Sequence, residues 1–407
     1  MSSYLISIFK KKDTVDFCLK SFSLLILLFA VFVPISLLLG EFYSSLFFQV
    51  FKGIFFLELL SLFMVFLFSF TRKSFDSFEL FLIFFGLISL FNGIINNPVD
   101  RFFFSHMYGW LISFLGYFVG KNFSERISLV ISNKLSDYLV KISFFVLFFF
   151  SLFYFTLYQT GKIAYFGIST MLPLFFFYFQ SKKKVFLAII CFFTMFLTGK
   201  RVVILGTILV VIFFLLLKTI NLLKSNMLSW KKMVLWMLAG LLLVTFFIYL
   251  VGENTTLLNR FKLFFSPDIF TEYGFYVATS GRSHEVKFLL RHLEENPLTW
   301  FVGGGWGDRF IESIDPTGYF GSWGKHYSHF SFFYFVLVYG LFFAFFAFKK
   351  FFYALKLIIE QKKDNFESKM YAYLFISSFS GSIMFVDPLF WFFLGSIYSY
   401  ECTKKNI

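Results

Sequence analysis

Long apolar stretches separated by short polar connections make up most of this chain. A helix needs about 20 mostly apolar residues to cross the ~30 Å hydrocarbon core of a bilayer. The pattern predicts an all-α polytopic membrane protein with about 12 transmembrane helices, near residues 21–39, 54–70, 78–95, 102–120, 138–158, 163–180, 184–199, 201–217, 233–251, 327–348, 369–386 and 388–401. We divide the chain into spans 1–9 in residues 1–251, an outer loop in residues 252–326, and spans 10–12 with a cytoplasmic tail in residues 327–407.

The distribution of positive charge predicts the orientation of these spans. Lysine and arginine are retained in short cytoplasmic loops, whereas long loops are translocated largely regardless of their charge. With both termini inside, the short outer connections hold few of the 37 lysines and arginines, namely Lys52, Arg101, Lys162, Lys200 and Arg201. The other cations outside the long loop fall on the inner side, so we expect the N- and C-termini in the cytoplasm.

The outer loop contains a segment with the period of an amphipathic helix. Asn296-Pro297 ends a run in which apolar residues recur at i, i+3, i+4 and i+7: Val286, Leu289, Leu290 and Leu293. Arg282 lies one turn before this run, at the start of its apolar face. If the face packs on the membrane domain, Arg282 points inward beside a helix N-terminus, which itself favours anions.

Composition narrows the class further. With 58% hydrophobic and 15% charged residues, the chain holds more apolar surface than a soluble domain of its size could bury. The net charge of +14 reflects the cytoplasmic loops, and lysines scattered among spans form no groove for nucleic acid. Three distant cysteines make no disulfide or metal pattern, and no cofactor is expected. The first apolar run lacks a cleavage site, so we interpret it as an uncleaved span.

Two cations in the tightest outer turn, Thr198-Gly199-Lys200-Arg201, are the first candidates for chemistry. The orientation signal disfavours them there, and a cation at the centre of a transmembrane helix costs about 2.5–3.5 kcal/mol. An ionisable residue in such a place is a functional hypothesis by default. Arg201 could grip a substrate diphosphate through paired N–H bonds, whereas the ordinary alternative is snorkelling of both side chains to lipid phosphates.

Histidine and arginine are concentrated in and just after the outer loop. Arg282 has the position described above, although a loop arginine is ordinarily a solvated charge. His326 and His329 lie at the expected outer end of the tenth span, where an imidazole with an ordinary pKa of about 6.5 suits proton transfer from a sugar hydroxyl. The ordinary alternative is a histidine satisfied within the core. His284 and Arg291 are secondary candidates on the amphipathic segment.

Other polar features have ordinary explanations. Gly303-Gly304-Gly305-Trp306-Gly307 resembles a phosphate nest, but no strand precedes it and no Lys-Ser/Thr follows it, which favours a flexible turn with an interfacial tryptophan. Asp387-Pro388 is expected to break a helix at the outer surface. Glu58 and Glu79, in or beside spans, could mark an ion path, but they are isolated carboxylates without matching partners. No set of His, Asp and Glu has the spacing of a catalytic metal site.

Three segments together resemble the O-antigen ligase and polymerase superfamily, bacterial enzymes that act on polyprenyl-diphosphate-linked glycans at the outer face of the plasma membrane. Leu197-Thr198-Gly199-Lys200-Arg201 is similar to the family's small-residue turn ending in arginine. Gly281-Arg282, the amphipathic helix, Asn296-Pro297 and the glycines at 303–305 resemble its loop signature. His329, followed eleven residues later by Gly340, resembles its histidine motif, and the layout of spans agrees.

The resemblance implies a GT-C-like fold and an inverting glycosyl transfer that needs neither metal nor cofactor. Arg201 and Arg282, with Lys200 beside them, would hold the diphosphate of a donor lipid such as undecaprenyl diphosphate and stabilise it as a leaving group. His329 would act as general base on the acceptor hydroxyl. The implied partners are polyprenyl-diphosphate-linked glycans, the lipid bilayer and a chain-length regulator, with no nucleic acid.

The leading hypothesis is therefore an O-antigen polymerase of the bacterial inner membrane, active in lipopolysaccharide biosynthesis. An O-antigen ligase, which transfers glycan to a lipid A core, shares the site and differs in the acceptor. A lipid-linked oligosaccharide flippase or other transporter belongs to another class, which predicts charges lining several spans and internal duplication. The charges of the candidate site are concentrated at the outer face, which favours an enzyme.

Overall fold

The computed structural model describes residues 16–22, 24–25, 44–69, 75–131, 134–159, 171–197, 201–224, 267, 271, 282–310, 330–361, 364–379 and 387–405. The regular structure of these residues is α-helical, without a β-strand. Of the expected spans, 233–251 lies outside the described residues, and 21–39, 54–70, 163–180, 184–199, 327–348 and 369–386 lie partly outside them. The described helices confirm an all-α protein.

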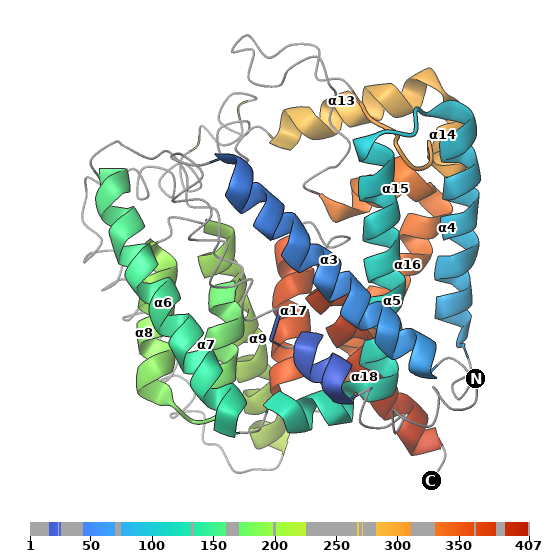
Figure 1. Cartoon of the computed structure of the whole chain (residues 1–407). Helices are drawn as coiled ribbons and strands as arrows, with labels where there is room; N and C mark the ends of the chain where they lie inside the picture. Colours follow the sequence, from blue (N-terminus) through green and yellow to red (C-terminus); the bar gives the residue numbers. More distant parts are fainter. Residues whose placement is uncertain are drawn as a thin grey trace, which may run out of the picture.

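The helices form two groups, which Figure 1 shows side by side. One group contains α6 (Lys134–Gln159), α7 (Met171–Ser181), α8 (Val185–Leu197) and α9 (Arg201–Lys224). The other contains α3 (Ser44–Ser69), α4 (Ser77–Asn96), α5 (Arg101–Ile131), α15 (Ser331–Tyr339), α16 (Leu341–Glu360) and α18 (Pro388–Lys405). The helix α17 (Phe366–Ser378) joins the groups, because it packs against α7 and α9 as well as α18. The helices α13 (Arg282–Glu295) and α14 (Pro297–Val302) lie across one end of the second group, which we call the α13 end.

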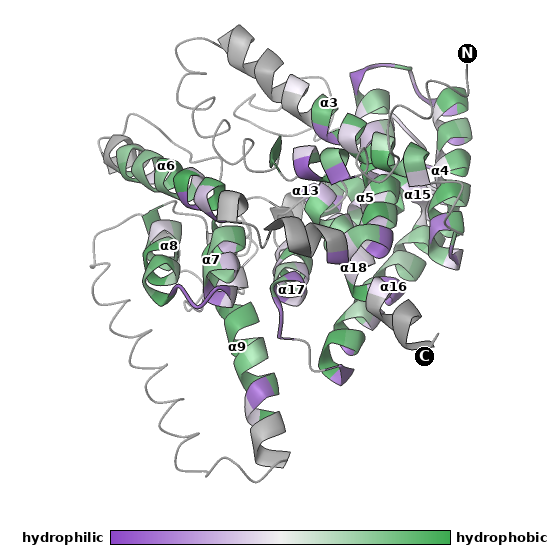
Figure 2. Ribbon diagram, turned by 60° about the horizontal axis from the view of Figure 1, so that its bottom comes forward, coloured by the Kyte–Doolittle hydropathy of each residue, from purple (hydrophilic) through white to green (hydrophobic). Residues whose placement is uncertain are grey.

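Three stretches of the described helices are long and apolar enough to cross a membrane: Ser77–Asn96, Arg101–Glu125 and Val203–Ile220. The surface of α4 shows what surrounds them. Its large apolar side chains Leu80, Phe84, Leu87 and Phe91 form one stripe and are each 46–62% exposed. Figure 2 shows hydrophobic residues over most of α4 and α8, whereas α13 is largely hydrophilic. The apolar surface of α4 suits lipid, and the chain is a helical membrane protein.

Glycines bring α5 and α18 into close parallel contact. A Cβ on Gly120 would clash with the carbonyl of Phe392, and one on Gly395 would clash with the carbonyl of Tyr117. Gly116 and Gly120 follow the small-xxx-small spacing that lets helix backbones approach in membranes. Because Pro388 lies beside Gly116 in the middle of α5, α18 begins inside the bundle. The expectation that Asp387-Pro388 lies at the outer surface is therefore wrong.

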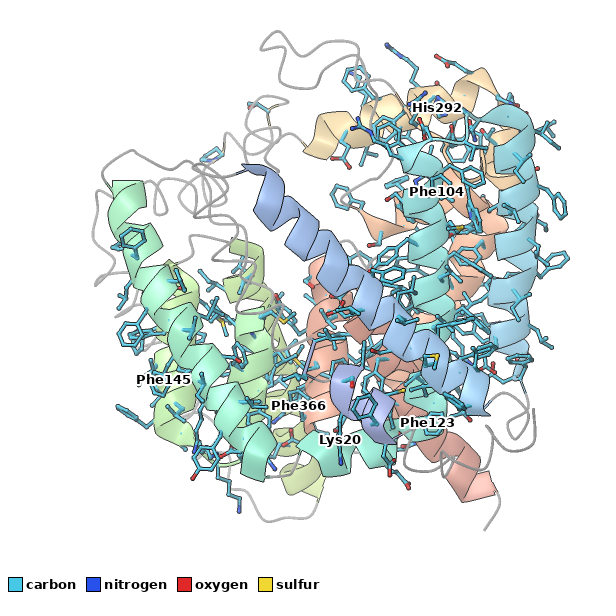
Figure 3. The ribbon with its side chains drawn as sticks, in the orientation of Figure 1. Lys20, Phe104, Phe123, Phe145, His292 and Phe366 are labelled. Carbon is cyan, nitrogen blue, oxygen red and sulfur yellow. The ribbon has the colours of Figure 1, made fainter. Side chains whose placement is uncertain are left out.

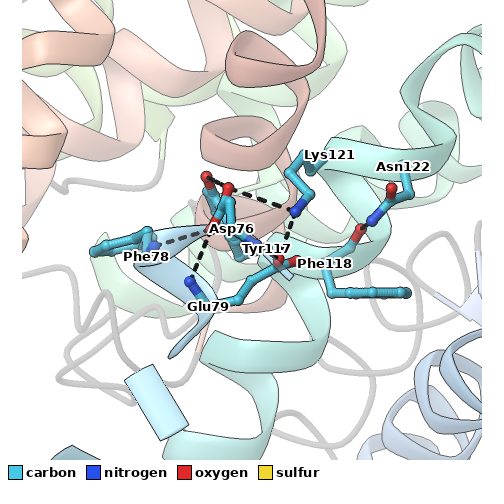
Figure 4. Close-up of polar contacts among 7 residues, drawn as sticks. All are labelled: Asp76, Phe78, Glu79, Tyr117, Phe118, Lys121 and Asn122. Atoms are coloured by element: carbon cyan, nitrogen blue, oxygen red, sulfur yellow. Dashed lines mark hydrogen bonds and ion pairs between the residues drawn. The ribbon is translucent and has the colours of Figure 1, made fainter. Parts of the chain in front are cut away.

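The beginning of α4 is fixed by a buried charged cluster, shown in Figure 4. Asp76 caps α4 by accepting from the backbone N–H groups of Phe78 and Glu79, and the Glu79 carboxylate accepts from the N–H of Asp76 in return. Lys121 of α5 forms an ion pair with Glu79, whose side chain is fully buried, and lies 3.4 Å from Asp76. Tyr117 donates to Asp76 at 2.9 Å. Glu79 thus has a matching partner, contrary to the expectation of an isolated carboxylate.

The expected tenth span, residues 327–348, does not form one helix. In its described part α15 ends at Tyr339 and α16 begins at Leu341 and continues to Glu360. Gly340 separates them with a φ of 87°, a left-handed conformation that residues with a Cβ rarely adopt. A Cβ at Gly340 would also clash with the carbonyl of Phe301 in α14. The hydrophobic pattern alone does not reveal this break, because both helices are apolar.

The two helices fold back on each other as a hairpin. The ring of Phe332 in α15 packs on Phe345 and Phe348 of α16, with centroids 5.7 and 5.3 Å apart. The chain of α16 then runs antiparallel to α4, because Phe343 stacks on Phe81 and Lys350 lies over the ring of Phe78. Consequently α15 ends near the α13 end, whereas a single span through 327–348 would have begun there.

Candidate functional site

The loop of residues 303–307, which we call the glycine loop, is buried between helices at the α13 end. Its backbone N–H groups donate to protein acceptors: Gly304 to the carbonyl of Leu337 at 2.8 Å, Gly305 to Val338 at 3.2 Å, and Trp306 to Ser89 at 2.9 Å. Gly307 donates to Nδ1 of His106 at 2.9 Å. These donors are occupied by protein groups and do not form a phosphate nest. A flexible turn is also excluded, because all five residues are buried.

Glycine is required in this loop for conformation and for space. Gly303, Gly305 and Gly307 have φ values of 75°, 86° and 90°, in the left-handed region. A Cβ on Gly305 would clash with the backbone of α4 at Gly93, and one on Gly303 would clash with the carbonyl of Val338. The loop therefore links α4 to the end of α15 by direct contact between backbones.

Side chains complete the link. The amide of Asn97, just after α4, donates to the carbonyls of Gly304 at 2.9 Å and Trp306 at 3.2 Å. The Ser89 hydroxyl donates to the carbonyl of Val338 at 2.9 Å. Trp306 is only 3% exposed, and its ring packs on Phe103 and Trp110 of α5. The expected interfacial tryptophan is therefore a core residue.

The amphipathic helix predicted in the loop is confirmed as α13, and its apolar face packs inward. Leu289 and Leu293 are fully buried, and α13 contacts both α14 and α15. On the same helix His292, labelled in Figure 3, contacts Asp308 with 3.0 Å between Nε2 and Oδ1. Asp308 directly follows the glycine loop, so this contact joins α13 to the end of that loop.

The electrostatics of this contact favour a charged histidine. The hydrogen bond to Asp308 raises the pKa of His292 more than burial lowers it, and the charges of Asp308 and Glu295 act in the same direction. The Asp308 side chain is 8% exposed, and its Oδ2 has no hydrogen-bond partner among the described residues. Arg309, the next residue, pairs instead with Asp100 at 3.2 Å. When protonated, His292 is the counter-charge of a buried carboxylate.

The sequence-predicted site residues are only partly described. Arg282 and His284 are in the first turn of α13 and Arg201 begins α9, but their side chains lie outside the description. Lys200, His326 and His329 also lie outside the described residues. Arg291 is exposed on α13.

The helices that flank two of these positions do come together. The helix that Arg282 begins packs against α15, which starts two residues after His329. Ser331 at the start of α15 is 1% exposed, and Phe335 packs on Trp391 of α18, which adjoins Gly116 in the middle of α5. Thus α15 starts inside the bundle, and the position of His329, which lies outside the described residues, stays a prediction. The structure does not place Arg201 against either helix.

Sequence reasoning overlooked the residues that build this arrangement, above all His106, His292, Asp308 and Asn97. His106 had a usable signal, because it is a lone ionisable residue within an expected span, and such residues are functional or structural by default. It is fully buried, and its ring lies 5.6 Å from that of Tyr334 in α15. The His292–Asp308 pair had no such signal, since neither spacing nor period relates these two positions.

Among the described residues, no group of three or more His, Cys, Asp or Glu side chains is arranged to hold a metal ion. Comparison with known proteins adds no relative: no protein-family model, curated protein or solved structure matches this chain.

Proposed function

We propose that this protein is a membrane-embedded glycosyltransferase that joins polyprenyl-diphosphate-linked oligosaccharide repeat units, as O-antigen polymerases do. In this proposal the chain crosses a bacterial plasma membrane about twelve times, with a GT-C-like fold, cytoplasmic termini and the α13 end outside. The observation that carries it is the packing of α13 against α15, fixed by the glycine loop. This packing gives the segments after Arg282 and after His329 a defined common framework, which a two-substrate reaction requires.

The proposed reaction is a single inverting displacement. The acceptor hydroxyl attacks the anomeric carbon of the donor, its proton passes to His329, and the bond from that carbon to the diphosphate oxygen breaks. The electron pair leaves with the polyprenyl diphosphate. Arg282, Arg201 and Lys200 neutralise the charge that develops there, an effect worth on the order of 10²–10³ in rate per well-placed donor in other enzymes.

The test uses the purified protein in lipid vesicles with a polyprenyl-diphosphate-linked repeat unit as the only glycan. The expected result is a ladder of longer lipid-linked products together with free polyprenyl diphosphate. Arg282→Ala and His329→Ala should each abolish the ladder, whereas Lys287→Ala, an exposed change on the same helix, should preserve it. Normal ladders in both site variants would contradict the proposed site.

Deletion of the gene in its host distinguishes a polymerase from a ligase or a flippase. If the surface polysaccharide collapses to a core that carries one repeat unit, the missing activity is polymerisation. If no repeat unit reaches the core, a ligase or a flippase is the better explanation. An unchanged ladder would contradict all three.

A further inference from the structure

Two histidines contact the glycine loop and the residue that follows it: His106 of α5 binds Gly307, and His292 of α13 binds Asp308. Nδ1 of His106 accepts the N–H of Gly307 at 2.9 Å, so this nitrogen carries no proton. Protonation of Nδ1 would turn the acceptor into a donor and set it against the Gly307 N–H. The buried His106 therefore has to be neutral for the loop to bind α5.

His292 has the opposite requirement. Its partner Asp308 is a buried carboxylate whose Oδ1 also accepts from the N–H of Arg309 at 2.9 Å, while its Oδ2 has no hydrogen-bond partner among the described residues. A charged donor stabilises such an acceptor more than a neutral one, since it adds the attraction between opposite charges to the hydrogen bond. Loss of the proton from His292 would leave this carboxylate buried beside a neutral ring.

We propose that a neutral His106 and a protonated His292 act together as positioning residues that keep α13 docked only within an intermediate range of pH. The pair holds the helix that begins at Arg282, so the same range would limit the proposed glycosyl transfer. That second consequence rests on the proposed function, whereas the docking itself does not.

The direction of each limb follows from the contacts. The docked state raises the pKa of His292, so the contribution of this pair is fully present below its undocked pKa and is lost as pH rises through the docked value. At the acidic limb, protonation of His106 is coupled to release of Gly307. Docking is therefore strongest between the two limbs.

Other ionisable groups surround the two histidines. Glu295 adds to the rise in the pKa of His292, and the ring of Tyr334 in α15 lies 5.6 Å from that of His106. His284 is on the same helix as His292, and its side chain lies outside the description. The helix α14 has none, and α15 contributes tyrosines, which stay neutral over this range. Arg309 and Asp100 are paired with each other. The remaining charged residues of α13 near His292 are Glu285, Lys287, Arg291, Glu294 and Glu295.

Hydrogen–deuterium exchange of the whole protein in lipid nanodiscs tests the docking without any substrate. Protection of peptides from residues 282–310, corrected for intrinsic exchange and compared with α16, should peak near neutral pH. It should fall about tenfold on going from neutral pH to the acidic side and to the alkaline side, the scale of one charge-assisted hydrogen bond. Constant protection over this range would overturn the proposal.

Conservative variants assign each limb. His106→Asn keeps an acceptor that cannot be protonated, so the acidic loss should disappear while the alkaline loss remains. His292→Gln keeps a donor without charge, so protection should be lower and no longer fall at alkaline pH. Glu294→Gln, an exposed charge change on the same helix, should leave the wild-type curve intact. If His106→Asn and His292→Gln retain both limbs, the two histidines are not the positioning residues.

The vesicle assay supplies the second readout. His329 and Arg282 are unchanged in both variants, so a limb of the pH–rate profile that disappears in one variant belongs to the substituted histidine. Exchange curves that behave as expected in a protein that makes no polymer would support the docking and reject the proposed function. If the protein makes polymer, but the pH–rate profiles of the variants are unchanged and the exchange curves are flat, the proposed function is supported and the pH-dependent docking is rejected.

Discussion

The two ends of α4 are fixed by different chemistry. At its beginning, side-chain charges do the work: Asp76, Glu79 and Lys121 form a buried cluster between α4 and α5. The end of α4 is held mainly by backbone contacts, because the glycines allow the glycine loop to approach Ser89 and Gly93 directly. The first arrangement depends on balanced charge and the second on the absence of Cβ atoms, so different substitutions should break them.

Removing the counter-charge at the beginning of α4 should have the largest effect. Lys121→Met leaves Glu79 buried without its partner and should lower the free energy of unfolding by about 3–5 kcal/mol. Titration of the purified protein with SDS, followed by circular dichroism, measures this. Adding Glu79→Gln to that variant should recover most of the loss. Lys356→Met removes an exposed ion pair and should cost less than about 1 kcal/mol.

Adding one methyl group at the other end should have a comparable but smaller effect. Gly305→Ala forces a side chain into a left-handed φ and against the backbone of α4, and should cost about 3 kcal/mol in the same titration. Gly53→Ala is the matched control, because nothing lies within 4 Å of its added Cβ. Equal stability of the two variants would mean that the glycine loop is not tightly packed.

Breaking the contact between His292 and Asp308 should lower the free energy of unfolding less than either Lys121→Met or Gly305→Ala. Asp308→Asn keeps the shape of the side chain but removes the charge that His292 binds, and should cost about 1–3 kcal/mol near neutral pH. The same variant should show smaller losses at alkaline pH, where the wild-type histidine is already neutral. A cost that is independent of pH would indicate that His292 is not charged in the docked state.

The smallest effect is expected at the neighbouring pair. Arg309 and Asp100 are each 32% exposed at the side chain, and exposed ion pairs contribute about 0–1 kcal/mol. Arg309→Met should therefore leave the SDS midpoint nearly unchanged. A large loss here would show that the packing of the arginine over Phe102, 5.3 Å from its ring centroid, matters more than its charge.

The helices whose hydrophobic pattern repeats locally were predicted correctly from the sequence. The span expected at 78–95 corresponds to α4 at Ser77–Asn96, and the amphipathic stripe around Leu289 corresponds to α13. The break at Gly340 was missed because apolar residues continue on both sides of it, and nothing in the period shows that Phe301 approaches there. The long outer loop was expected to hold a flexible turn, since glycine adds freedom unless distant partners remove it.

The candidate site was harder to predict for the same reason. The contact of Gly307 with His106 joins positions 201 residues apart, and that of His292 with Asp308 depends on how α13 packs beside the glycine loop. Arg282 and His329 were singled out by their positions in the pattern and then by a resemblance of motifs, and their roles remain predictions. The sequence did contain one usable signal, His106, because a lone histidine buried in a span requires a specific partner.

The short α15 has a consequence for how the chain enters the membrane. At nine residues it is about 14 Å long, roughly half the thickness of the hydrocarbon core, so it cannot halt export as an independent span. Its position must be reached after synthesis, when α4, α5 and α16 are present to receive it and Gly340 is shielded by protein rather than lipid. If the glycine loop cannot pack, α15 would stay outside its place in the bundle, where an added protease could cleave it.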